Sequence, residues 1–110
     1  MKVITKGHTT TIKDTEGNIV SFLEKVTSQY TSFKEHNLIL DISHDKSVDE
    51  KSITIFSELS KKHKKAKKSF VLVVNSIDFN KVPVSIIVVP SLLEAHDMIE
   101  MDEIERDLGF

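Results

Sequence analysis

The sequence predicts an α/β fold in which one domain, residues 1–110, holds a mixed, mainly parallel sheet of about four to five strands and about three main helices. Three observations predict it. Short β-rich segments alternate with helical stripes along the chain. The segment "SFVLVVNS" (Ser69–Ser76) is nearly all apolar, which is typical of a central strand covered by helices on both faces. The length of 110 residues suits a single hydrophobic core.

Five segments have the composition of strands. "KVIT" and "TTTIK" are split by Lys6-Gly7-His8, which indicates either a hairpin or one bent edge strand. "NLILDIS" and "SFVLVVNS" are the most apolar segments, so we expect them to be adjacent and central, with the second as the sheet centre. "VSIIVV" follows Pro83. The predicted strands span residues 2–6, 9–13, 37–43, 69–75 and 84–89.

Three segments have helical periodicity. The first, predicted over 18–35, has a stripe at spacings of three and four residues, with Asn18 placed to cap it. Its stripe consists of Ile19, Phe22, Leu23, Val26, Tyr30 and Phe33. The last, predicted over 91–108, opens at Pro90-Ser91 with the spacing of a capping box. Its stripe of Leu92, Ala95, Met98 and Ile99 would cover the sheet, and Ile104 and Leu108 would extend it.

The middle helix is predicted over 48–66. Ser47-Val48-Asp49-Glu50 matches the capping box, in which the serine oxygen accepts a free helix N–H and the glutamate returns to the serine N–H. We therefore interpret Ser47 as a helix cap rather than a modification site. The inward face would consist of Val48, Ser52, Ile55, Phe56 and Leu59.

Several classes of chemistry lack their residues. The chain has no cysteine, which excludes disulfides, thiolate metal sites and a cysteine nucleophile. No close His-x-His pair occurs among His8, His36, His44, His63 and His96, so we expect no metal site, and we expect His63 to be solvated. "GNIVS" lacks the residues of a phosphate-binding loop, and we expect no cofactor and no catalytic residue. Without a signal peptide or a membrane-spanning run, we expect a cytoplasmic protein.

The charges are unevenly distributed. Residues 94–110 carry seven acids and one arginine, whereas "KKHKKAKK" gathers six lysines: Lys61, Lys62, Lys64, Lys65, Lys67 and Lys68. Cations are favoured at a helix C-terminus by about 0.3–1 kcal/mol each, so the first interpretation of this run is a solvated helix end. Arginine and aromatic side chains, which read bases, are absent from it, so we expect no nucleic acid. The alternative is a site for a polyanion such as RNA.

The order of elements resembles the STAS domain family, which includes anti-sigma-factor antagonists. An apolar strand ending near Asp41, a loop with Asp49, a helix, an apolar strand and an acidic terminal helix carry the resemblance. It spans nearly the whole chain. "SLLEAHDMIEMDEIERDLGF" is similar to the ending of small STAS-like proteins of the Bacteroidota, some of which are labelled ribonuclease Z. That nuclease needs a His-x-His-x-Asp-His zinc cluster, which this chain lacks, so we interpret the label as that of a neighbouring gene.

The resemblance implies a regulatory motif, Asp-Ser-Ser-Gly, whose second serine accepts phosphate from a partner kinase. With Asp49 on the aspartate of the motif, Glu50 and Lys51 replace the two serines and Ser52 replaces the glycine. The acceptor is missing in this frame, and a frame shifted by one residue would make Ser52 the phosphorylation site.

We therefore expect a non-catalytic regulatory or scaffolding module that binds a protein partner, either an anti-sigma-factor-like kinase or a nuclease. The expected contact is the loop of residues 43–52. The side chains of this loop that we expect to contact the partner are Ser43, His44, Asp45, Ser47, Asp49, Glu50, Lys51 and Ser52. The alternative is an accessory factor that brings RNA to a nuclease through the lysine run.

Overall fold

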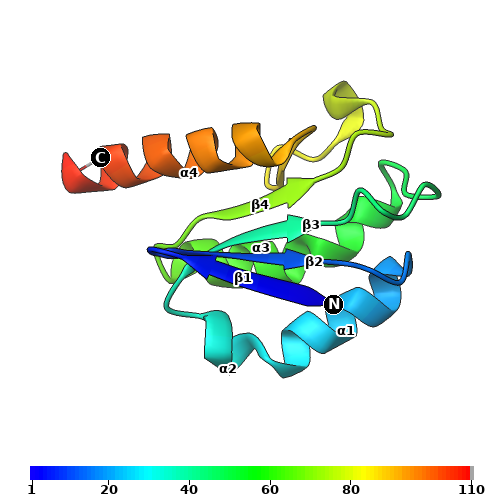
Figure 1. Cartoon of the computed structure of the whole chain (residues 1–110). Coiled ribbons are helices and arrows are strands. Elements are labelled where there is room, and N and C mark those ends of the chain that lie inside the picture. The colour runs from blue at the N-terminus through cyan, green and yellow to red at the C-terminus, as the bar shows by residue number, and fades with distance from the viewer. Residues whose placement is uncertain (110) are drawn as a thin grey trace.

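The structure is a computed structural model that describes residues 1–109, and its strands form one five-stranded sheet in the order β1-β2-β3-β4-β5. The strands are β1 (Lys2–Lys6), β2 (Thr9–Lys13), β3 (Asn37–Asp41), β4 (Phe70–Val73) and β5 (Ile87–Val89). β1 is antiparallel to β2, and every other neighbouring pair is parallel. Figure 1 shows this sheet with the carboxyl ends of β2, β3 and β4 pointing the same way. The predicted fold class is confirmed.

The hairpin interpretation of the first two strands is also confirmed. Gly7 turns the chain between β1 and β2 with a φ of 61°, a left-handed conformation in which a side chain would be strained. β3 lies between β2 and β4, and β4 lies between β3 and β5, so the two most apolar strands are adjacent and interior. The middle strand of the sheet is β3, not β4 as the continuous apolar run predicted.

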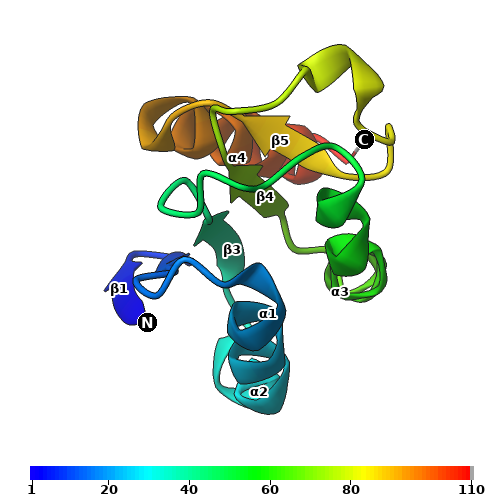
Figure 2. The ribbon, with the colours of Figure 1, turned by 90° about the vertical axis from the view of Figure 1, so that its right-hand side faces the viewer.

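Helices cover both faces of the sheet, as Figure 2 shows in end view. They are α1 (Ile19–Ser28), α2 (Tyr30–Phe33), α3 (Ser57–Lys65) and α4 (Leu92–Asp107), with 3₁₀ turns η1 (Ser52–Phe56) and η2 (Phe79–Lys81). α1, α2 and α3 pack on one face, and α4 packs on the other. Within residues 1–109, no helix has the length and apolarity needed to cross a membrane.

The core follows the two-residue alternation of a strand. Leu38 and Leu40 face the larger cluster beneath α1 and α3, whereas Ile39 joins Val71 and Val73 beneath α4. These side chains are buried, and each fully buried one stabilises the fold by about 1.5–3 kcal/mol relative to exposure. The side chains on the two faces of β3 and β4 therefore anchor the helices that cover the sheet. The same strands determine which residues lie at the amino end and at the carboxyl end of the sheet.

Two predicted helix caps are confirmed. The Asn18 side chain accepts the Ser21 N–H at 3.1 Å, and the Ser91 hydroxyl accepts the Glu94 N–H at 3.2 Å. Ala95 and Ile99 of α4 are buried against the sheet, but Leu92, Ile104 and Leu108 are exposed. The apolar stripe therefore covers the sheet only from Ala95 to Ile99. The predictions that Leu92 covers the sheet and that Ile104 and Leu108 extend the stripe are wrong.

Two predicted boundaries are wrong. The helix expected over 18–35 breaks at Gln29, whose N–H is shared between the Lys25 and Val26 carbonyls, and α2 then carries Tyr30 and Phe33 into the core. The strand expected over 84–89 begins only at Ile87, because residues 84–86 form a turn after Pro83 and leave Val84 fully exposed. Pro83 itself has no N–H to donate to a strand ladder, and the Ile86 N–H donates to the Pro83 carbonyl at 3.1 Å to close the turn.

The predicted start of the middle helix is also wrong, and Ser47 does not cap it. Asp45 Oδ1 accepts both the Ser47 N–H, at 2.9 Å, and the Ser47 hydroxyl, at 2.6 Å, so Ser47 closes a turn with the residue two positions before it. Regular structure begins at Ser52, after Asp49 Oδ1 accepts the Ser52 N–H at 2.7 Å. The later start makes Ile53 a fully buried residue and leaves Ser52 only half-buried.

Candidate functional site

The fold places the predicted site residues at opposite ends of the sheet. Residues 43–52, here called the carboxyl-edge loop, follow the carboxyl end of β3. The lysine run surrounds the C-terminus of α3 and leads into the amino end of β4. Since the central strands are parallel, the loop and the run lie at opposite edges, and no single site can include both.

Three aspartate–serine pairs hold the carboxyl-edge loop. Asp41 Oδ1 accepts the Ser43 N–H at 3.0 Å and the Ser43 hydroxyl at 2.6 Å. The Asp45–Ser47 pair repeats this geometry, and the Asp49–Ser52 pair closes the third turn. Each aspartate satisfies backbone N–H groups that no strand or helix uses. The loop is therefore preorganised rather than free.

Hydrogen bonding stabilises the charged form of two of these acids. The Ser47 hydroxyl and N–H lower the pKa of Asp45 below its ordinary value, and the Ser52 N–H does the same for the pKa of Asp49. Asp45 is buried, whereas Asp49 is exposed. The loop thus presents a fixed negative charge at Asp49 at neutral pH.

The serine hydroxyls of the loop each take part in hydrogen bonds with an aspartate. The Ser43 and Ser47 hydroxyls each donate to a carboxylate, and the Ser52 hydroxyl donates to the Asp49 carbonyl at 3.0 Å while accepting the Asp49 N–H at 2.9 Å. Phosphorylating Ser52 would remove its hydroxyl hydrogen bond to Asp49. The side chains of the loop that are exposed are His44, Lys46, Ser47, Asp49 and Lys51, and Glu50 is half-buried.

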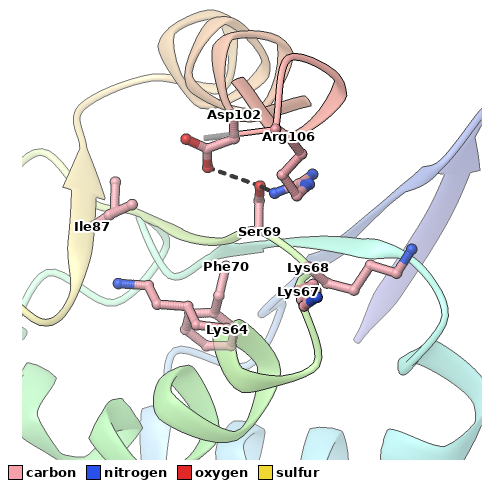
Figure 3. Close-up of a pocket in the computed structure, with 9 residues that line it drawn as sticks. Lys64, Lys67, Lys68, Ser69, Phe70, Ile87, Asp102 and Arg106 are labelled. Carbon is pink, nitrogen blue, oxygen red and sulfur yellow. Dashed lines mark hydrogen bonds between the residues drawn. The ribbon is translucent and has the colours of Figure 1, made fainter. Parts of the chain in front are cut away.

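The lysine run divides into two groups. Lys61, Lys62 and Lys65 are exposed on α3, as expected for a solvated helix end, and Lys62 Nζ lies 4.6 Å from the centre of the Tyr30 ring. Lys64, Lys67 and Lys68 line a cavity of about 580 Å³ at the amino edge of the sheet. This amino-edge pocket also includes Ser69, Asp102 and Arg106, as Figure 3 shows.

Ser69 joins β4 to α4 within the amino-edge pocket. Its hydroxyl donates to Asp102 Oδ2 at 2.8 Å and accepts from Arg106 Nη1 at 3.1 Å (Figure 3). Arg106 Nη2 also donates to Asn37 Oδ1 at 3.2 Å, and that oxygen accepts the Ser69 N–H at 2.9 Å. The network therefore connects β3, β4 and α4 at the start of both strands.

The expectation that His63 is solvated is wrong. Its ring is fully buried, the Tyr30 hydroxyl lies 2.8 Å from Nδ1, and Nε2 lies 2.7 Å from the His36 carbonyl oxygen. Because a carbonyl can only accept, Nε2 carries the proton and Nδ1 accepts from Tyr30. Lysines on both sides of His63 suggested a polar surface, but the helix turns this one position inward.

Sequence reasoning missed Asn37, Ser69, Asp102 and Arg106 as site residues. Arg106 is the single arginine among the seven acids of residues 94–110, and that departure from the local charge was the available signal. Its partners lie 37 and 69 positions earlier, so no spacing pattern connects them. Within residues 1–109, no three His, Cys, Asp or Glu side chains gather where they could hold a metal ion.

Comparison with known proteins adds no assignment to this geometry. The chain matches no protein-family model, and no curated protein matches it.

Proposed function

We propose that this chain is a non-enzymatic, STAS-like regulatory module that binds a protein partner through the carboxyl-edge loop, without a phosphoserine switch. The observation that carries the proposal is the set of three aspartate–serine turns that fix this loop. A preorganised loop loses little conformational entropy on binding, so more of the contact energy appears as affinity.

The position of the loop supports the same role. It follows the carboxyl end of an interior strand of an open α/β sheet, where ligands and partners of such folds bind. His44 lies beside the β2–α1 connection, since a Cβ at Gly17 would stand 3.7 Å from its ring. The contact surface therefore extends from the loop onto the neighbouring connection. In the frame of the STAS motif, the exposed Lys51 stands where the acceptor serine would be.

The test compares two double variants of the full chain. In Glu50→Gln with Lys51→Ala, the loop loses two charges of opposite sign while its three aspartate–serine pairs remain. In Lys61→Gln with Lys65→Gln, exposed charges change at the far end of the molecule. Quantitative affinity capture from native cells, followed by mass spectrometry, should find a protein bound by wild type and by the lysine variant and lost from the loop variant. Partners that the loop variant retains would contradict the proposal.

Intact-mass measurement on protein from its native cells tests the absence of a switch. We expect the unmodified mass, because the Ser52 hydroxyl is engaged with Asp49. One stoichiometric phosphate mapped to Ser52 would show that the shifted motif frame is correct.

The alternative function, carrying RNA to a nuclease, is favoured only by the exposed lysines of α3. Binding through phosphate contacts weakens steeply between low and physiological salt, because counterions are released. If wild type retains RNA at low salt and releases it at physiological salt, and Lys61→Gln with Lys65→Gln abolishes the retention at low salt, the accessory role replaces the regulatory one.

A further inference from the structure

The amino-edge pocket concentrates positive charge. Lys64, Lys67, Lys68 and Arg106 line it, and Asp102 is its one acidic lining residue within the part of the chain that the structure describes. Ion pairs within residues 1–109 join His8 to Glu103 and Lys25 to Glu16, so none of the four pocket cations has a carboxylate of these residues within 4.0 Å. Four cations that line one cavity, with no carboxylate of residues 1–109 paired to them, favour an anion there.

Acidic side chains lie near one side of the positively charged amino-edge pocket. Glu35, Glu103 and Asp107 line an adjacent hollow that shares Lys68 and Arg106 with the pocket. Lys64 and Lys67 do not line that hollow. The uncompensated positive charge is therefore strongest on the side of the pocket formed by the end of α3.

Two of the pocket cations are held in place. Arg106 donates to Ser69 and Asn37, which fixes its guanidinium group and leaves further N–H groups for a ligand. Lys64 Nζ donates to the Ser85 carbonyl at 2.7 Å. Partial burial lowers the pKa of Lys64, and the nearby Asp102 carboxylate opposes that shift. Burial disfavours the charged form of this lysine, so an anion beside the ammonium group stabilises that charged form.

Lys67 occupies a strained backbone position at the mouth of the pocket. Its φ of 64° is left-handed, which costs a non-glycine residue about 1–2 kcal/mol. The Lys67 N–H donates to the Lys64 carbonyl, and the Lys68 N–H donates to the His63 carbonyl, as in a helix C-cap where glycine is preferred. The lysine at position 67 places an ammonium charge at the pocket, although its left-handed backbone conformation costs stability.

We propose that the amino-edge pocket binds a small organic phosphate through Lys64, Lys67 and Arg106. A guanidinium fork and point-charge ammonium groups together are the donors that phosphate oxygens take in proteins. A cavity of about 580 Å³ lies in the range of small-molecule sites and can hold a ligand of sugar-phosphate size. Ile87, half-buried in the wall, offers apolar contact to the uncharged part of the ligand.

This site is independent of the carboxyl-edge loop, since it lies at the other edge of the sheet. The two proposals can therefore fail separately. The bound anion could be supplied as free phosphate or as the phosphate group of a metabolite, and the probes below distinguish these sources.

The test titrates ¹⁵N-labelled full-length protein with glucose 6-phosphate, inorganic phosphate and glucose, at constant ionic strength. Glucose 6-phosphate should give saturable amide shifts centred on Lys67, Ser69, Phe70 and Ile87, and glucose should give none. Weaker saturation by inorganic phosphate would show that the organic part contributes, whereas equal affinity would assign the pocket to free phosphate.

Two double variants provide the matched comparison, because each removes two lysine charges from the same short run. Lys64→Gln with Lys67→Gln should weaken phosphate binding by about tenfold or more, since two charge-assisted contacts are lost. Lys61→Gln with Lys65→Gln should leave it within about twofold. The proposal is overturned if no probe saturates at millimolar concentration, or if both variants weaken binding equally.

Discussion

The Tyr30 hydroxyl donates to His63 Nδ1 at 2.8 Å inside the core, and His63 Nε2 donates to the His36 carbonyl at 2.7 Å. The two rings meet edge to face, with centroids 5.6 Å apart. This contact joins α2 to α3 and to the chain entering β3. Tyr30 is the first residue of α2, directly after the break of the first helix at Gln29.

A buried neutral histidine makes stability depend on pH. Burial lowers the pKa of His63 below its ordinary value of 6.5, with a smaller contribution from the charge of Lys68, although the bond to the His36 carbonyl opposes the shift. The unfolded chain therefore takes up a proton before the folded chain does. The contribution of His63 to stability is complete above pH 6.5 and is lost as the pH falls below it.

We expect the melting temperature of wild type to fall between about pH 7 and 5, a range above most carboxyl titrations. In His63→Gln, which cannot take up a proton, this fall should be smaller, although the variant is less stable at neutral pH. Circular dichroism melts of both proteins check this. Parallel pH profiles would show that His63 does not cause the dependence.

Tyr30→Phe tests the same contact from the other side. The substitution leaves His63 Nδ1 buried without a donor, so we expect a loss of about 1–3 kcal/mol in the free energy of unfolding. Tyr30 is buried, so the ring itself should keep its packing. Denaturant unfolding measures the loss, and an unchanged midpoint would contradict the buried hydrogen bond.

Asp49, rather than Ser47, should determine the stability of the turn before η1. Asp49→Ala removes the acceptor of the Ser52 N–H, and we expect it to cost about 1 kcal/mol. Asp49→Asn keeps a side-chain oxygen in that place and should cost much less. Chemical denaturation of the pair provides the measurement. Equal stability of the two variants would show that the side chain of residue 49 does not cap the turn.

Lys67→Gly should stabilise the fold. Glycine removes the strain of the left-handed conformation at φ 64°, although it adds entropy to the unfolded chain, and the net gain should be about 0.5–1 kcal/mol. The control Lys65→Gly lies in α3 and should destabilise by about 1 kcal/mol. Thermal melts distinguish the two. Destabilisation by Lys67→Gly would show that position 67 is not strained.

Asn37→Ala should destabilise the amino edge of the sheet. Asn37 is buried, and its Oδ1 accepts both the Ser69 N–H and Arg106 Nη2, so its removal leaves a buried N–H unpaired at a cost of about 1–3 kcal/mol. Asn75→Ala, at an exposed position after β4, should change stability by no more than about 0.5 kcal/mol. Urea unfolding of the two variants gives the difference, and similar values would contradict the network.

Local patterns in the sequence determined the fold class and most of its elements. The stripe from Ile19 to Phe33, the apolar run in "NLILDIS" and the serine before α4 each depend on residues a few positions apart, and they predicted α1, β3 and the cap at Ser91. The same patterns failed where two local interactions compete. Ser47 could pair forward with the helix or back with Asp45, and only the fold shows that it pairs back.

Tertiary structure alone decided the rest, because the remaining contacts join residues far apart in the chain. His63 stands among lysines in sequence but is buried, since Tyr30 and the His36 carbonyl satisfy both of its nitrogens. Lys64 and Lys67 belong to a pocket, and not merely to a basic run, because α4 brings Arg106 to the start of β3 and β4. The parallel register of those strands places Asn37 and Ser69 side by side, and such a register depends on packing both faces of the sheet at once.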